Sequence, residues 1–207
     1  APVRLPSDRI HEGFTKDSTV SCQVVVIGTG AGGAVVAAEL AKRGMDVVMV
    51  EAGQHFAPES FGGDITQHFR EMYWNGGATV ALGRPSIPVP LGRTVGGTTT
   101  VNSGTCFRIP DRILDKWGLQ DLHIDRASLE LAFQQVEKRI SVQSVSEDLL
   151  RGSSRVIARG AERLNLKHGP LLRNVKDCKG NAVCVFGCPE NAKQSMNITY
   201  IPDALEN

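Results

Sequence analysis

Three glycines at the spacing Gly-x-Gly-x-x-Gly are the residues whose types and positions most clearly predict chemistry. Gly28, Gly30 and Gly33 follow four apolar residues and open a run with helical spacing. The first glycine allows a tight turn, the second lets the backbone approach a pyrophosphate, and the third lets a helix pack on a strand. The N–H groups and positive dipole end of that helix would hold the phosphates. The pattern predicts a dinucleotide-binding turn.

A strand, a helix and a second strand must position this turn. Val24–Ile27 is an apolar run typical of a parallel strand that is buried on both faces. Apolar residues recur at helical spacing over Ala31–Arg43, and Gly44 provides a C-terminal stop. Asp46–Val50 predicts the second strand, and Glu51 ends it with a carboxylate that could bind both ribose hydroxyls. This acid favours FAD or NAD over NADP.

A second stretch, Gly92–Thr105, is rich in glycine, threonine, serine and asparagine. That composition suits a loop wrapped on a polar ligand, because backbone amides and hydroxyls can donate to phosphate or to ring heteroatoms. The charged guanidinium group of Arg93 could donate hydrogen bonds to phosphate oxygens. An ordinary surface loop has the same composition, so both interpretations stay open at this point.

The overall composition excludes several classes of function. The 207 residues can bury a core, and they suggest one large domain or two small ones. With 23 Lys and Arg against 22 Asp and Glu and no basic run, nucleic acid is not expected as a partner. No apolar run reaches the length of a membrane span. The chain starts at Ala1, so a removed leader would leave no trace.

The remaining elements are predicted from periodicity and from turn residues. They are a lead-in over 1–19, a helix at Ile65–Trp74, a strand pair at Ala78–Leu82 and Ile87–Val89, helices at Asp111–Lys116, Ile124–Ile140 and Ser146–Leu164, a strand at Pro170–Val175, and the start of a helix at Tyr200–Asn207. The helix at Ser146–Leu164 should turn Val156, Ile157 and Leu164 inward. An arginine stripe, which we interpret as a solvated face, should lie outward at Arg151, Arg155, Arg159 and Arg163.

Together, the two glycine regions resemble the glucose–methanol–choline (GMC) oxidoreductase family. Val24–Gly53 resembles the family's N-terminal FAD-binding motif, and GRTVGGTTTVNSGT (Gly92–Thr105) resembles its Gly-Arg-x-x-Gly-Gly-Ser/Thr-Ser/Thr-x-x-Asn signature, which lies along the flavin. The resemblance covers the chain from about Cys22 onward as an N-terminal portion. The segments PDRILDKW and GCPENAKQSMNITYIPDAL resemble the bacterial and long-chain-alcohol-oxidizing branches.

The resemblance implies an α/β fold, with a Rossmann-like FAD-binding domain (a parallel sheet with helices) and a partly helical insertion. The expected organisation is a lead-in at 1–21, an FAD-binding region at 22–117 with a flavin-contacting loop at 91–105, and the insertion at 118–207 with a cysteine-rich loop at 177–195. The polypeptide is expected to continue beyond residue 207, in a longer precursor or a second chain.

Residue roles follow from the resemblance by position. The pyrophosphate would be held by the first turn, the adenosine ribose by Glu51, and the ribityl and isoalloxazine parts by the second loop. The cofactor-binding residues are thus Gly28, Thr29, Gly30, Ala31, Gly32, Gly33, Glu51, Ala52, Arg93, Gly97, Thr98, Asn102, Gly104 and Thr105. Cys106-Phe107 stands where many members carry an aromatic or small residue, which leaves the wall of the flavin pocket open.

The resemblance assigns no catalytic residue to this chain. In the family the base is a histidine from the C-terminal part, paired with a second histidine or an asparagine. This chain has five histidines, and none lies in a matching sequence context: His11, His55, His68, His123 and His168. The implied enzyme oxidises a hydroxyl group of an alcohol or sterol-like substrate by hydride transfer to flavin. One alternative is an inert flavin-binding or electron-transfer subunit. The other is an NAD-dependent dehydrogenase, which would not explain the loop at Gly92–Thr105.

Three of the five cysteines are crowded into one loop. Cys178, Cys184 and Cys188 resemble a ferredoxin run in which Asn181 replaces the second cysteine. Some dehydrogenases of the family carry a three-iron, four-sulfur cluster on three such cysteines, so a 3Fe-4S cluster is one interpretation. Structural thiols or a disulfide, and a zinc site with His168, are the others. The odd count favours a reducing compartment such as the cytoplasm, or a metal site, over a disulfide framework.

Overall fold

A computed structural model describes residues 5–13, 16–118 and 125–207 of this mixed α/β chain. The chain divides into two compact units, Ala1–Gly104 with Asn181–Asn207, and Thr105–Gly180. His123 and Ile124 lie outside the described residues. Among the helices that the structure describes, none has both the length and the apolar character needed to cross a bilayer.

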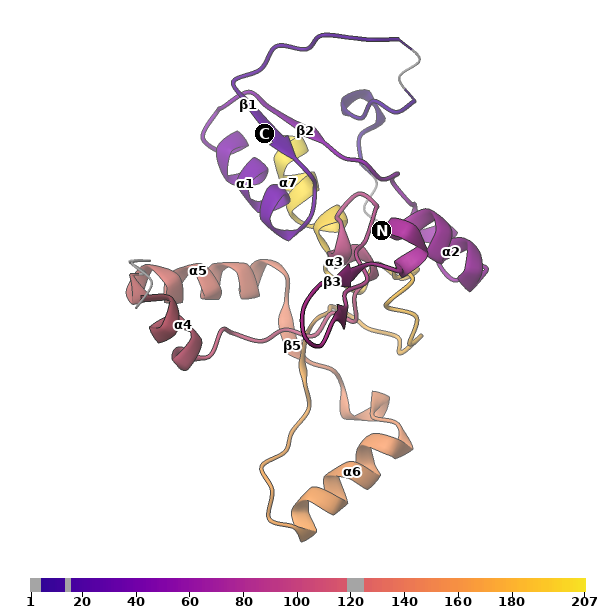
Figure 1. The fold of residues 1–207 in the computed structure, drawn as a ribbon, viewed down its shortest axis with the longest axis vertical. Helices are drawn as coiled ribbons and strands as arrows, with labels where there is room; N and C mark the ends of the chain where they lie inside the picture. Colours follow the sequence, from indigo (N-terminus) through magenta and orange to yellow (C-terminus); the bar gives the residue numbers. More distant parts are fainter. Residues whose placement is uncertain (1–4, 14–15, 119–124) are drawn as a thin grey trace. The chain divides into compact units, whose positions relative to one another are not determined.

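The first unit begins with the predicted strand–helix–strand motif (Figure 1). β1 (Val24–Ile27) and β2 (Val47–Val50) pair in parallel, with α1 (Ala31–Ala41) between them in the chain. Gly44 has a φ of 77°, and its N–H donates to the Ala41 carbonyl at 2.8 Å, which closes the last turn of the helix. The strand–helix–strand prediction is confirmed.

α1 buries an alanine face, and α7 (Tyr200–Glu206) lies beside it (Figure 1). Small side chains let two helices approach closely, and Tyr200 and Ile201 of α7 are 4% and 3% exposed. The buried residues of α1 are Ala34, Ala37, Ala38 and Ala41. The helix predicted at the end of the chain therefore forms and covers α1.

Only one face of β1 is covered by the described residues. Val26 is 8% exposed and faces α1, where its Cγ1 would lie 3.2 Å from a Cβ on Gly33. Val25 and Ile27 are 56% and 87% exposed. Burial of both faces was predicted from the apolar run, but in the described residues this sheet contains only β1 and β2. A strand with one packing partner buries only alternate side chains.

The rest of the first unit holds short elements around an aromatic cluster. They are the helices α2 (Ile65–Met72) and α3 (Thr98–Val101), the antiparallel strands β3 (Val80–Ala81) and β4 (Ile87–Pro88), and 3-10 turns at Ser7–Arg9, Pro58–Ser60, Trp74–Gly77 and Met196–Ile198. The core cluster comprises Phe61, Met72, Tyr73 and Val101, with Phe56 and Phe69 packed against it. The predicted helix and strand pair are confirmed over shorter spans.

In its described residues, the second unit combines three helices with one antiparallel strand pair. These are α4 (Asp111–Gly118), α5 (Arg126–Arg139), β5 (Val142–Ser144), the 3-10 turn Glu147–Leu149, α6 (Gly152–Arg163) and β6 (Leu172–Asn174). The helix predicted at Ser146–Leu164 is split into the turn and α6. Ile157 and Leu164 are 70% and 71% exposed, so the prediction of an inward face was wrong: in the described residues they are not covered.

Candidate functional site

The first glycine turn has the geometry that its spacing predicts. Gly28 has a φ of 88°, and its N–H donates to the Val50 carbonyl at 2.7 Å, which holds the turn at the end of β2. A Cβ on Gly33 would overlap the Gly28 carbonyl oxygen, because the first turn of α1 packs directly on the end of β1. Only glycine fits at that position.

Open space lies in front of the helix end. A Cβ on Gly30 or on Gly32 would meet no atom within 4 Å. No side chain caps α1, and the first hydrogen bond within the helix runs from the Ala34 N–H to the Gly30 carbonyl at 3.0 Å. The preceding N–H groups therefore point toward the helix end without a helical acceptor. Together with the helix dipole, this arrangement suits an anionic group such as a pyrophosphate.

Glu51 links the turn to the residues after β2. Its Oε2 accepts hydrogen bonds from the Thr29 N–H at 2.9 Å and from the Thr29 hydroxyl at 2.7 Å. Its Oε1 accepts from the Gly53 N–H at 2.9 Å. A carboxylate offers about four lone-pair positions, so these three bonds leave capacity for one more donor. Glu51 thus has a structural role besides the ribose contact that was predicted for it.

The second glycine loop lies against the first turn, although more than sixty residues separate them in the sequence. The Gly96 N–H donates to the Thr29 hydroxyl oxygen at 2.9 Å. Gly97 has a φ of 55°, and a Cβ there would lie 2.9 Å from the Gly30 Cα. A Cβ on Gly53 would overlap the backbone of Arg93 and Thr94. The two regions predicted to bind one cofactor are therefore joined backbone to backbone.

Other predicted residues of the second loop have local partners. Arg93 donates through Nε to the Ala52 carbonyl at 3.3 Å, and its guanidinium lies 5.1 Å from the centre of the Trp74 ring. The Thr98 hydroxyl accepts from the Gly92 N–H at 3.0 Å. The Gly104 N–H donates to Asn102 Oδ1 at 2.9 Å. Thr105 belongs to the second unit, where it pairs with Arg173.

A buried polar segment, residues 193–199, packs against the second loop and was not predicted from the sequence. The Met196 N–H donates to the Thr99 hydroxyl oxygen at 3.0 Å, and the Thr100 hydroxyl donates to Asn197 Oδ1 at 3.3 Å. The polar residues with the lowest exposure in this segment are Lys193, Ser195, Asn197 and Thr199. Polar residue types normally lie at the surface, so nothing in their sequence pattern marks them as buried.

The predicted metal site is not supported by the structure. None of the five cysteines forms a disulfide. Across residues 5–13, 16–118 and 125–207, no three Cys, His, Asp or Glu side chains gather in a group that could hold a metal ion. A cluster would need its thiolates to converge on one point. Cys188 Sγ instead accepts from the Lys193 N–H at 3.5 Å.

Two of the described histidines, His55 and His68, are at least partly buried in the first unit. His68 is buried, with Nδ1 3.4 Å from Met72 Sδ and its ring 6.2 Å from that of Phe186. Burial lowers the pKa of His55, and the Glu12 carboxylate partly opposes that shift. The absence of a catalytic histidine from this chain stays a prediction.

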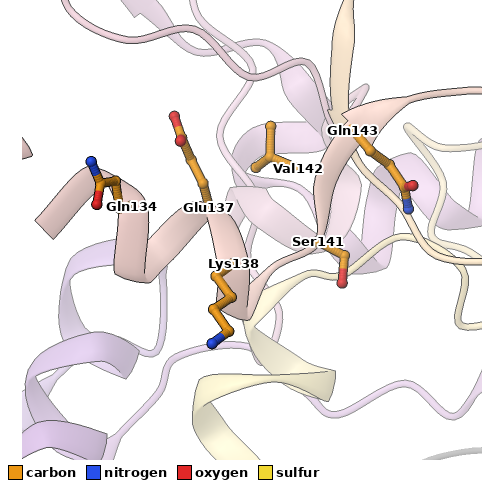
Figure 2. Close-up of a pocket in the computed structure, with 6 residues that line it drawn as sticks. All are labelled: Gln134, Glu137, Lys138, Ser141, Val142 and Gln143. Atoms are coloured by element: carbon orange, nitrogen blue, oxygen red, sulfur yellow. The ribbon is translucent and has the colours of Figure 1, made fainter. Parts of the chain in front are cut away.

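A pocket of about 470 Å³ in the second unit lies where α5 ends and β5 begins (Figure 2). Its lining consists of Gln134, Glu137, Lys138, Ser141, Val142 and Gln143. None of these is among the predicted cofactor-binding residues.

Comparison with protein families identifies the chain at the level of its family. The family described as GMC oxidoreductase matches residues 69–207, which is more than half of the chain. This chain belongs to the GMC oxidoreductase family. A second family, described as an NAD(P)-binding Rossmann-like domain, matches residues 26–80, which contain the first glycine turn. The matched regions correspond to the N-terminal FAD-binding region of GMC oxidoreductases, and they overlap at residues 69–80, between the two glycine motifs.

GMC-type relatives match most of this chain but are much longer. An uncharacterized GMC-type oxidoreductase of Mycobacterium tuberculosis is 38% identical over 192 residues, which cover 90% of this chain and 30% of the relative. A long-chain-alcohol oxidase of Arabidopsis thaliana is 31% identical over 192 residues, covering 91% of this chain and 25% of that protein. A formate oxidase structure from Aspergillus oryzae has a TM-score of 0.34 at 24% identity over 46% of this chain and 18% of that chain, a likeness too weak to support a conclusion.

Proposed function

We propose that this chain forms the FAD-binding part of a GMC oxidoreductase that oxidises a hydroxyl group by hydride transfer to flavin. The observation that carries the proposal is the contact between the two glycine regions. Gly97 lies against Gly30, and Gly96 is hydrogen-bonded to Thr29. One extended cofactor could therefore run from the end of α1 along the second loop.

The proposed roles follow from what each group can donate or accept. The N–H groups at the start of α1 would bind the pyrophosphate, and the open space at Gly30 and Gly32 would admit it. The remaining lone-pair capacity of Glu51 would accept from a ribose hydroxyl. Arg93, Thr98 and Asn102 would orient the flavin end. Bound FAD would supply the hydride acceptor, which the side chains of a protein lack.

The proposed substrate class is an apolar alcohol. Support comes from the Arabidopsis long-chain-alcohol oxidase, to which 91% of this chain is similar. The chain spans only 25% of that protein, so the proposed alcohol-oxidising activity belongs to the whole polypeptide. We propose that a C-terminal remainder or a second chain supplies the base that takes the hydroxyl proton.

The deciding experiment is the visible absorption spectrum of the natural full-length protein, before and after anaerobic addition of 1-dodecanol. We expect two flavin bands that bleach with the alcohol. Flavin bands that persist with every alcohol, but bleach with a chemical reductant, would favour an inert electron-transfer subunit. A protein that neither contains nor binds added FAD would refute the cofactor assignment. Broad brown absorbance beside the flavin bands would contradict our interpretation of the cysteines as thiols.

A further inference from the structure

Lys193 is a buried lysine whose ammonium group is surrounded by carbonyl oxygens. The residue is 1% exposed. Its Nζ donates to the carbonyls of Thr100 at 2.7 Å, Asn102 at 2.8 Å and Cys184 at 2.6 Å. An ammonium group has three N–H donors, so these three acceptors satisfy it completely. A buried charge is costly unless it is hydrogen-bonded in this way.

Two of these carbonyls lie at the C-terminal end of α3. The last carbonyls of a helix lack partners within the helix and need donors from elsewhere. Lys193 serves Thr100 and Asn102, and the Tyr73 hydroxyl lies 2.8 Å from the carbonyl oxygen of Val101 between them. Three consecutive carbonyls of the second loop therefore face buried side-chain donors.

The same two side chains reach the cysteine-containing segment, residues 184–188, where the single O–H of Tyr73 can donate to only one of the two carbonyls near it at a time. The Cys184 carbonyl accepts from Lys193, and the Val185 carbonyl lies 2.5 Å from the Tyr73 hydroxyl. The Phe186 ring packs edge-on against Phe69 at 5.4 Å between centres. Segment 184–188 is thus linked to the second loop through the side chains of Lys193 and Tyr73, and to α2 through the aromatic contact.

We propose that Lys193 is a positioning residue for the cofactor-binding loop. Its ammonium group fixes the carbonyl end of α3, and this holds Asn102 and the backbone from Gly97 onward in the arrangement that contacts the first glycine turn. The inference rests on the proposed FAD site. It also gives the cysteine-containing segment a role without a metal: its backbone carbonyl completes the set of acceptors around Lys193.

The first test is FAD binding by the natural full-length protein with Lys193→Met, which keeps the length of the side chain and removes the charge and its donors. The matched control is Lys167→Met, at an exposed lysine. Apoprotein is titrated with FAD, and flavin fluorescence and visible circular dichroism are recorded. We expect Lys193→Met to weaken FAD binding at least tenfold and to alter the dichroism of the bound flavin, and Lys167→Met to match the unmodified protein.

A second variant covers the case in which Lys193→Met does not fold. Lys193→Ala leaves out three carbons and the ammonium group, which propylammonium can replace. We expect propylammonium, but not tetramethylammonium, to restore FAD binding, because only the former has N–H donors for the three carbonyls.

The outcomes separate this inference from the proposed function. If the unmodified protein binds FAD and Lys193→Met binds it with equal affinity and equal dichroism, the role of Lys193 is refuted and the FAD site stands. Rescue of Lys193→Ala by both cations, or by neither, also refutes it. If the unmodified protein does not bind FAD, the proposed function itself fails.

Discussion

The substitution Gly30→Val separates binding of the cofactor from folding. Gly30 has a φ of −69°, a value that residues with side chains adopt readily, and a Cβ there would meet no atom within 4 Å. The change therefore adds three carbons to open space in front of α1. Because the site is a partly exposed helix N-cap, we expect a loss in the free energy of unfolding of only about 1 kcal/mol.

The effect on FAD should be much larger than the effect on stability. A side chain at Gly30 occupies the position proposed for the pyrophosphate and keeps it from the N–H groups of α1. Hydrogen bonds to a charged group contribute about 1.5–3 kcal/mol each, so the loss of two would cost about 3–6 kcal/mol. That corresponds to a rise in the dissociation constant of about 10²- to 10⁴-fold.

The assay pairs an FAD titration of the apoprotein with thermal unfolding. Gly160→Val is the matched control, because a Cβ at Gly160 in α6 also meets no atom within 4 Å. We expect the control to bind FAD as the unmodified protein does. If Gly30→Val retains unmodified affinity, the pyrophosphate does not lie at this turn, and the assignment of the site is wrong.

Three further predictions concern the turn and its support. Gly33→Ala forces a Cβ onto the Gly28 carbonyl, so the free energy of unfolding should fall by about 3 kcal/mol in urea titrations. Gly32→Ala is the control and should be tolerated. Equal stability of the two variants would contradict the close packing of α1 on the end of β1. Glu51→Ala removes three hydrogen bonds and should lower both FAD affinity and urea resistance; unchanged affinity would place the ribose elsewhere. Burial raises the pKa of Tyr73, so the native state keeps the phenolic proton longer than the unfolded chain, and stability should fall as pH rises above about 10. Tyr73→Phe should reduce that slope, and an unchanged slope would assign it to another group.

Local patterns predicted the elements of this chain better than the contacts between them. The turn at Gly28 and the helix stop at Gly44 follow from backbone conformations that neighbouring residues dictate, and both were predicted. The contact of Gly97 with Gly30 depends on how the 66 intervening residues fold, and no local signal encodes it. Family resemblance supplied the expectation that the two regions serve one cofactor, and the backbone contact gives it a physical basis.

Residues that violate the usual rule for their type could not be predicted. Lys193 belongs to the class that is almost never fully buried, yet it is 1% exposed because three carbonyls surround its ammonium group. Ile157 shows the converse, since an apolar residue predicted to point inward is 70% exposed in the described residues. Helical periodicity identifies an apolar face but does not identify the surface that covers it.

Five glycines in and near the two loops differ in what a Cβ would meet, and the difference supports the proposed site. At Gly33, Gly53 and Gly97 a Cβ would meet backbone atoms, so these glycines are needed for the chain to pack on itself. At Gly30 and Gly32 a Cβ would meet nothing, and their place in the fold does not require glycine. Glycine at the start of a helix, beside open space and N–H groups without helical acceptors, is explained by a ligand that needs the room. The fold accounts for the first class, and the proposed pyrophosphate would account for the second.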